Sequence, residues 1–241
     1  MIATQKHGGE GDVTLGATSN DILQRRSIRR YQEQPVEDTL IADILAEARW
    51  APSAGNTQST DVSVVTGAAL GRTKSALLEA TENDSPPAPD VEPAAQWPEP
   101  FKSRMAGLFE TRTAFVAAEG GRRGLTRAEP KPSPRTVMAG LFGAPVLLLL
   151  AMDKDVSPAY GCFDAGLLAQ TIALSAHARA LGTCIMTSTV RAADALHRAL
   201  PETEGKDLVA AITLGYPDLD APINRFPRDR ISLDEFVTNV R

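Results

Sequence analysis

The chain has 241 residues, a length that fits one large domain, because dividing a chain length by ~150 gives a rough domain count. Its apolar fraction of 43% and charged fraction of 23% exclude a disordered chain, a collagen-like fibre and a disulfide-dense scaffold. The net charge of −5 leaves no basic footprint with which to neutralise phosphates, so a nucleic-acid partner is not expected.

Cysteine usage and apolar runs indicate the compartment. Cys162 and Cys184 are too far apart for a CxxC motif, and we expect both to be packed as small hydrophobic residues. The longest apolar stretch, 144–152, is far shorter than the ~20 residues of a membrane span. Residues 1–18 are polar and lack the apolar core of a signal peptide. We therefore expect a cytoplasmic protein, not associated with a membrane, with a flexible tail over 1–18.

The first predicted elements alternate helices with one strand. The run Ser19-Asn20-Asp21 is typical of a helix N-cap and predicts a short helix that ends near the basic residues 25–30. After Pro35, apolar residues recur at intervals of three and four over 40–48, which predicts an amphipathic helix. Residues 51–58 (Ala-Pro-Ser-Ala-Gly-Asn-Thr-Gln) predict a loop. A strand is expected over 61–66 and a helix over 68–80.

A proline-rich segment follows, which we bound at about 83–136. Nine of the 17 prolines lie between Pro86 and Pro134. Inside the segment we expect a helix over 101–117 and a turn at the Gly-Gly-Arg-Arg-Gly sequence of 120–124. Because the segment is longer than an ordinary loop, it indicates either a functional lid or a poorly ordered stretch.

The apolar run 145–152 predicts a strand covered on both faces. The helix predicted over 163–181 is apolar on all sides, which fits burial inside a monomer and burial in a dimer interface equally well. Strands over 183–186 and 207–214 flank a helix over 192–200. Long helices between irregularly spaced strands favour an α+β fold with a mixed three-layer sheet.

Motifs of the common enzyme classes are missing. The sequence has no GxGxxG after a strand, no GxxxxGK[ST], no GxSxG and no HExxH. The three histidines are widely spaced, so no metal site is expected. Two arginine clusters remain, and forked guanidinium groups are the usual partners of a phosphate, although a solvated charge run is the alternative for either cluster alone. The clusters comprise Arg25, Arg26, Ser27 and Arg29 near one end of the chain, and Arg228 and Arg230 near the other.

Four motifs occur in the order seen in the FMN-dependent nitroreductase family. They are Arg-Arg-Ser-Ile-Arg-Arg-Tyr at 25–31, the loop 51–58, Ala-Leu-Gly-Thr-Cys-Ile at 180–185, and Arg-Asp-Arg at 228–230. From Ser19 to the C-terminus, apart from the proline-rich segment, the chain resembles that family. The Thr-Ser-Thr sequence of 187–189 looks more like the iodotyrosine deiodinase branch. Trp97-Pro98 and residues 142–145 look like bacterial reductases that act on nitroaromatic acids.

The resemblance implies a three-layer α-β-α sandwich with a mixed, mainly antiparallel sheet. It implies one FMN-binding domain over 19–241 and a homodimer, assembled by the region 163–181, with the active site at the interface. Tightly bound FMN is the implied cofactor, and NADH or NADPH the co-substrate. The residues implied to contact FMN are Arg25, Ser27 and the backbone of Arg26 at the phosphate and ribityl end, closed by Arg228 and Arg230; Arg29 at the pyrimidine edge near N1 and O2; Pro52, Ser53, Ala54 and Asn56 of the partner subunit at the edge of the ring; and Thr187, Ser188 and Thr189 near N5.

The implied reaction is ping-pong transfer of reducing equivalents from NAD(P)H through FMN to a small nitroaromatic or quinone-like acceptor, without a side chain acting as acid or base. One-electron and two-electron chemistry both stay open. The proline-rich segment would be a lid, with Trp97, Phe101 and Phe109 as stacking residues and Arg122 or Arg123 as partner of an acceptor carboxylate. Alternatives are a deiodinase-like or other flavin-dependent reductase or dehydrogenase on the same fold, a flavin-binding protein without turnover, and a structural homodimer.

Overall fold

The structure is a computed structural model that describes residues 19–93, 96–122 and 133–241. Its strands are β1 (Thr60–Val65), β2 (Val146–Asp153), β3 (Gly182–Met186) and β4 (Lys206–Gly215). They form a sheet in the order β1-β2-β4-β3, and every pairing is antiparallel. A mixed sheet was expected, but among the described residues parallel pairing is limited to two isolated bridges outside the strands, Ser27–Thr183 and Ala88–Ala192. The segments that contain Ser27 and Ala88 each form a bridge at a single residue, so neither adds a parallel strand.

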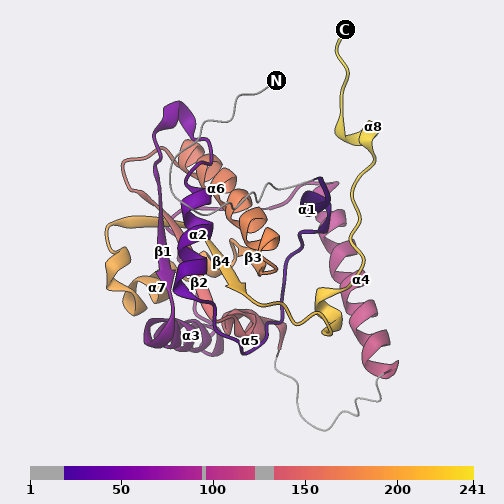
Figure 1. Ribbon diagram of the computed structural model, residues 1–241, viewed down its shortest axis with the longest axis horizontal. Coiled ribbons are helices and arrows are strands. Elements are labelled where there is room, and N and C mark those ends of the chain that lie inside the picture. The colour runs from indigo at the N-terminus through magenta and orange to yellow at the C-terminus, as the bar shows by residue number, and fades with distance from the viewer. Residues whose placement is uncertain (1–18, 94–95, 123–132) are drawn as a thin grey trace, which may run out of the picture.

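Two layers of helices cover the sheet (Figure 1). The helices α3 (Gly67–Glu82), α5 (Pro134–Ala139) and α7 (Ala193–Ala199) pack on one face, and α2 (Asp38–Ala48) and α6 (Pro158–Ala178) pack on the other. Successive side chains of a strand point to opposite faces. Consequently Leu147 and Leu149 of β2 belong to the first core and Leu148 and Leu150 to the second, which confirms the α+β fold with three layers.

The remaining helices lie at the ends of the chain and in the proline-rich segment. They are α1 (Ser19–Gln24), α4 (Phe101–Arg122) and α8 (Leu233–Phe236), and short 3₁₀ turns complete the structure: η1 (Ala54–Asn56), η2 (Leu141–Gly143), η3 (Thr189–Arg191), η4 (Pro201–Thr203) and η5 (Pro222–Asn224). Within the described residues, no helix is both long and apolar enough to cross a membrane.

Three local predictions were wrong. The turn expected at 120–124 lies within α4 as far as Arg122, since glycine is tolerated in a helix although it weakens it; residues 123–124 lie outside the described residues. The helix expected from Phe163 begins at Pro158, because proline suits the first helical position. Cys162 is exposed and only Cys184 is buried, since Cys162 lies on a face of α6 that the single chain does not cover, together with Tyr160 and Phe163, both 63% exposed.

The first part of the proline-rich segment is attached to the body of the molecule. The Ala88 N–H donates to the Arg191 carbonyl at 2.8 Å. The Asp90 carboxylate accepts from the Leu208 N–H at 2.8 Å and from His197 Nε2 at 3.0 Å. The next element, α4, lies beside the C-terminal segment and away from the sheet (Figure 1). The start of the proline-rich segment, around residues 88–90, is therefore held by hydrogen bonds against α7 and β4.

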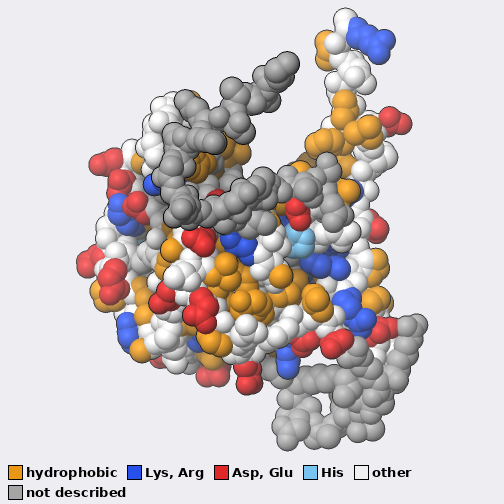
Figure 2. All heavy atoms as spheres, in the orientation of Figure 1, with side chains coloured by type: hydrophobic (Ala, Val, Ile, Leu, Met, Phe, Trp, Pro, Cys, Tyr) orange, Lys and Arg blue, Asp and Glu red, His pale blue; other side chains and the backbone are white. Residues whose placement is uncertain are grey.

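The C-terminal arm, residues 231–241, projects away from the body (Figure 1) and carries apolar side chains along its length (Figure 2). Leu233, Phe236 and Val240 are 73%, 74% and 91% exposed. Contiguous apolar surface of this kind is typical of a protein–protein contact.

Candidate functional site

The basic segment 25–31 is fixed against the start of β3. Ser27 forms an isolated bridge with Thr183, and the Ile28 N–H donates to the Thr183 carbonyl at 2.8 Å. The Ile28 side chain packs onto Gly182, where a Cβ would lie 2.5 Å from Ile28 Cγ1. Gly182 therefore allows the close approach that places the arginines at this end of the sheet.

Asn224 ties the C-terminal segment to the basic segment. Its side chain is buried, with 1% of the residue exposed. Asn224 Oδ1 accepts from the Arg29 N–H at 2.7 Å, and Nδ2 donates to the Arg30 and Asp218 carbonyls at 2.8 Å each. Two segments that lie 195 residues apart in the sequence are thereby held side by side.

Phe226 lies between two of the predicted arginines. The ring is buried, and the guanidinium carbons of Arg26 and Arg29 each lie 5.9 Å from its centroid, within the range of a cation–π contact. Arg26 also donates to the Phe226 carbonyl. These contacts orient both guanidinium groups without neutralising them.

Arg228 and Arg230 lie beside Arg25, an adjacency that the family resemblance implies. Arg228 Nη2 donates to the Leu23 carbonyl at 3.0 Å and Nη1 to the Arg25 carbonyl, whereas Arg230 Nη1 donates to the carbonyl of Asp229 at 2.7 Å. Arg228 thus also joins the two segments, and both of its Nη atoms already donate a hydrogen bond to a backbone carbonyl.

The electrostatics of the arginine cluster indicate an anion site. Burial lowers the pKa of Arg25, and the nearby charges of Arg228 and Arg230 lower it further. Burial likewise lowers the pKa of Arg26, with Arg228 and Arg29 adding to the effect. Within the described part of the chain, no ion pair joins any of these arginines to a carboxylate.

Arg25 also has a buried hydrogen-bond donor without a partner among the described residues. Its Nε atom is shielded from solvent and has no hydrogen-bond partner in the described structure, an arrangement that costs free energy unless an acceptor is supplied. Half-buried, mutually repelling guanidinium groups are not a solvated charge run. The donors and charges of this cluster fit the phosphate of FMN.

The Thr-Ser-Thr turn follows β3 directly. Thr187 and Ser188 are exposed and Thr189 is buried at the start of η3. Ser188 Oγ donates to Met138 Sδ at 3.3 Å. Ser188 and Thr189 line a hollow of about 550 Å³. Two of the three predicted hydroxyl groups are therefore accessible in the single chain.

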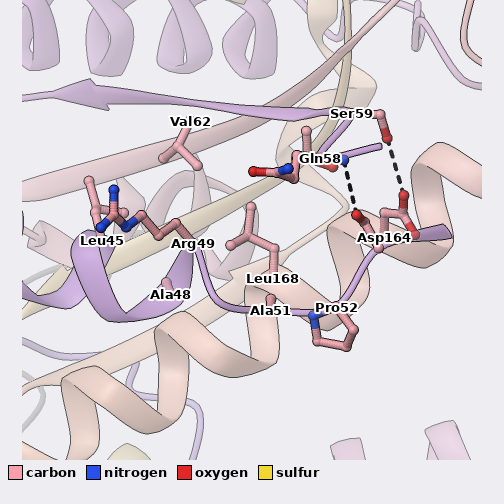
Figure 3. Close-up of a pocket in the computed structure, with 12 residues that line it drawn as sticks. Leu45, Ala48, Arg49, Ala51, Pro52, Gln58, Ser59, Val62, Asp164 and Leu168 are labelled. Carbon is pink, nitrogen blue, oxygen red and sulfur yellow. Dashed lines mark hydrogen bonds between the residues drawn. The ribbon is translucent and has the colours of Figure 1, made fainter. Parts of the chain in front are cut away.

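The loop 51–58 lies apart from the arginine cluster. Pro52 and Asn56 are exposed, and Ser53 and Ala54 are partly buried. The side-chain hydrogen bonds found for this loop run to Asp164 of α6 or stay within the loop. Pro52 and Ser53 line a pocket of about 270 Å³ between α2, β1 and α6 (Figure 3). One chain thus presents the predicted site residues as two separate groups.

The predicted stacking residues are exposed on or beside α4. Trp97, Phe101 and Phe109 are 62%, 47% and 45% exposed, and the Trp97 and Phe101 rings meet edge to face with centroids 6.4 Å apart. Arg122 ends α4, and nothing is described of its side chain. Arg123 lies outside the described residues.

Arg112 of α4 is a candidate site residue that sequence reasoning missed. Its guanidinium lies 4.8 Å from the Phe109 ring centroid. Burial lowers its pKa, and the charge of Arg29 lowers it further. Two turns along the same helix, Glu119 pairs with Arg225 at 3.4 Å. The spacing of seven residues between Arg112 and Glu119 is the signal that both share a face.

Metal binding finds no support in the side-chain clusters. Over the described residues, no group of three His, Cys, Asp or Glu side chains is arranged to hold a metal ion.

Comparison with known proteins gives a consistent result. The profile of the nitroreductase family matches residues 22–216. A nitrobenzene nitroreductase of Ectopseudomonas oleovorans is 32% identical over 225 residues, covering 91% of this chain and 95% of that protein. A 4-nitrobenzoate reductase of Pseudomonas putida is 30% identical over 214 residues, covering 86% and 89%. The crystal structure of the FMN- and NADPH-dependent nitroreductase NfnB of Sphigopyxis sp. strain HMH matches with a TM-score of 0.80 at 25% identity, covering 94% of this chain and 99% of that one.

Proposed function

Because the chain belongs to the nitroreductase family, we propose that it is an FMN-dependent oxidoreductase that reduces nitroaromatic or quinone-like acceptors with NADH or NADPH. The observation that carries this proposal is the half-buried arginine cluster, which holds an orphaned Arg25 Nε and no carboxylate partner among the described residues. A structural protein gains nothing from such a cluster, since its unneutralised charges oppose folding.

FMN, when bound, would supply the redox chemistry that couples oxidation of the nicotinamide to reduction of the acceptor. The phosphate would be held by Arg25, Ser27 and the backbone of Arg26, with Arg228 and Arg230 closing the site. Arg29 would face the pyrimidine edge, where a fixed cation stabilises negative charge. The turn 187–189 would lie beside N5. No side chain is required as a general acid or base.

The protein acts as a homodimer in this proposal. The loop residues Pro52, Ser53, Ala54 and Asn56 would edge the flavin bound by the partner subunit, which accounts for their separation from the arginines of their own chain. The exposed apolar residues of α6 and of the C-terminal arm support the same assembly.

The insertion over 83–136 serves as a lid in a domain that spans 19–241. Its exposed aromatic side chains on α4, Phe101 and Phe109, together with Trp97, support stacking on an aromatic acceptor. Arg122 or Arg123 stays the proposed partner of an acceptor carboxylate, and Arg112 adds a cation whose pKa the charge of Arg29 lowers.

An anaerobic titration of the purified protein tests the function. The protein is expected to show the flavin absorbance bands, to be bleached by NADH or NADPH, and to be reoxidised by nitrobenzene or 4-nitrobenzoate. A colourless protein that takes up no added FMN would refute the proposal. A yellow protein that neither nicotinamide bleaches would be a flavin-binding protein without turnover.

A further inference from the structure

The loop 51–58 holds an uncommon backbone conformation. Gly55, Asn56 and Gln58 have φ values of 58°, 58° and 50°, in the left-handed region that side chains other than glycine rarely adopt. Within the loop, Ser53 Oγ accepts from the Gln58 N–H at 3.0 Å. Such a conformation persists only where its surroundings determine it, and it is enriched at ligand sites.

Asp164 of α6 supplies those surroundings. Asp164 Oδ1 accepts from the Ala54 N–H at 3.0 Å. Asp164 Oδ2 accepts from Ser59 Oγ at 3.2 Å and from Thr57 Oγ1 at 3.5 Å, and Figure 3 shows the bond from Ser59. One carboxylate therefore holds two positions of the loop, Ala54 and Thr57, and the residue that follows it, Ser59.

Asp164 is a buried carboxylate of α6. The residue is 3% exposed and makes no ion pair within the described residues. A buried carboxylate is costly unless hydrogen bonds satisfy it, and among the described residues the donors come from Ala54 and Thr57 of the loop and from Ser59 directly after it. The loop in turn carries residues that we place at the partner's flavin.

We propose that Asp164 is the positioning residue that fixes the loop 51–58 in the conformation with which it edges the flavin of the partner subunit. This inference rests on the proposed function. Its content is specific: the carboxylate acts through the Ala54 N–H and the Ser59 hydroxyl, and it contacts no flavin itself.

The test compares Asp164→Ala with Ser175→Ala. Ser175 is a second buried polar residue of α6, 7% exposed, and its Oγ donates to Glu47 Oε2 at 2.7 Å. The same Oγ accepts from Arg179 Nη1 at 2.9 Å, so Ser175→Ala removes two hydrogen bonds from the same helix without touching the loop. Asp164→Asn keeps an acceptor for Ala54 and loses the one for the hydroxyl groups, so it provides an intermediate variant that preserves volume.

Two readouts are used, and the first needs no cofactor. In the FMN-free protein, Asp164→Ala should raise the hydrogen-exchange rate of the Ala54 amide about tenfold or more, since a bond to a charged acceptor is lost, and Ser175→Ala should leave it unchanged. In the FMN-bound protein, Asp164→Ala should raise the FMN dissociation constant about tenfold and alter the visible circular dichroism of the flavin. Asp164→Asn should retain Ala54 protection and show a smaller change in the flavin spectrum.

Unchanged Ala54 exchange in Asp164→Ala would overturn the inference, because the carboxylate would then not hold the loop. Faster exchange with unchanged FMN affinity and dichroism would overturn it too, since the loop would not belong to the flavin site. If Asp164→Ala fails to fold, Asp164→Asn carries the comparison through its flavin spectrum. A wild-type protein that binds no FMN refutes the proposed function instead, and the exchange experiment still decides whether Asp164 holds the loop.

Discussion

Replacing Arg25 by methionine should have opposite effects on FMN affinity and on the stability of the FMN-free protein. The pKa of Arg25 is lowered by burial and by Arg228 and Arg230, so its charge opposes folding when no anion is bound. Removing that charge relieves the repulsion and also removes the orphaned Nε donor. The free energy of unfolding of the FMN-free variant should therefore equal or exceed that of the wild type.

The same change removes a charge-assisted bond to the phosphate. Such a bond contributes about 1.5–3 kcal/mol, which corresponds to a factor of about 10 to 150 in the dissociation constant. Because Arg26, Arg228 and Arg230 remain to hold the phosphate, we expect the lower half of that range. Methionine keeps the apolar stem of the side chain, which limits the loss of packing.

FMN affinity is measured by quenching of flavin fluorescence, and stability by urea unfolding of the FMN-free protein. The matched control is Arg30→Met in the same segment, whose side chain is 68% exposed and 4.0 Å from Asp218; it should change stability by less than about 0.5 kcal/mol and leave FMN affinity unaltered. The reasoning is refuted if Arg25→Met binds FMN as tightly as the wild type, or if its FMN-free form is clearly less stable.

Three further predictions follow from the same structure. Arg112→Ala should raise KM about tenfold for 4-nitrobenzoate and little for nitrobenzene, whereas Arg104→Ala, whose guanidinium lies over the exposed Phe101 ring, should affect neither; equal effects on both acceptors would argue against a role in binding the carboxylate. Leu149→Ala, at a fully buried position of β2, should lower the free energy of unfolding by about 2–5 kcal/mol in urea titration, and a loss below 1 kcal/mol would show that the site collapses around the cavity. Arg179 lowers the pKa of Glu47. Glu47 therefore stabilises the fold at pH values above the ordinary carboxyl pKa of ~4.3, and this contribution is lost as the pH falls through the lower pKa of the folded state. The free energy of unfolding of Glu47→Gln should be lower than that of the wild type at pH 7, by a difference that shrinks in acid; a pH-independent difference would contradict this.

Much of the fold could be predicted from the sequence because its signals are local. The buried leucines of β2 form a continuous apolar run, and the three-and-four spacing of α2 survives in the structure as one buried face, Ile41, Ile44 and Ala48. Where the local signal was ambiguous the prediction failed. The glycine pair at 120–121 indicated a turn, but both residues lie within α4. Cys162 lies in an apolar stretch and was expected to be buried, but it is on a face of α6 that its own chain leaves exposed.

Part of the candidate site was also readable from the sequence. Residue type singled out the two arginine clusters, the family resemblance implied that they share one site, and the structure places them side by side. Arg112 and Asp164 were not predicted, because their significance depends on what a helix face packs against. Asp164 stands in an otherwise apolar stretch, where a single acidic residue reveals nothing until the loop that donates to it is known.

The joining of residues 25–30 to residues 224–228 has a consequence for biosynthesis. Asn224 and Arg228 join the C-terminal segment to a part of the domain that is among the first to leave the ribosome. The sheet ends at Gly215, so a nascent or shortened chain can contain every strand and still lack these contacts. If the arginine cluster holds FMN as we propose, flavin binding is a late step of biosynthesis, which requires synthesis of the chain through Arg230.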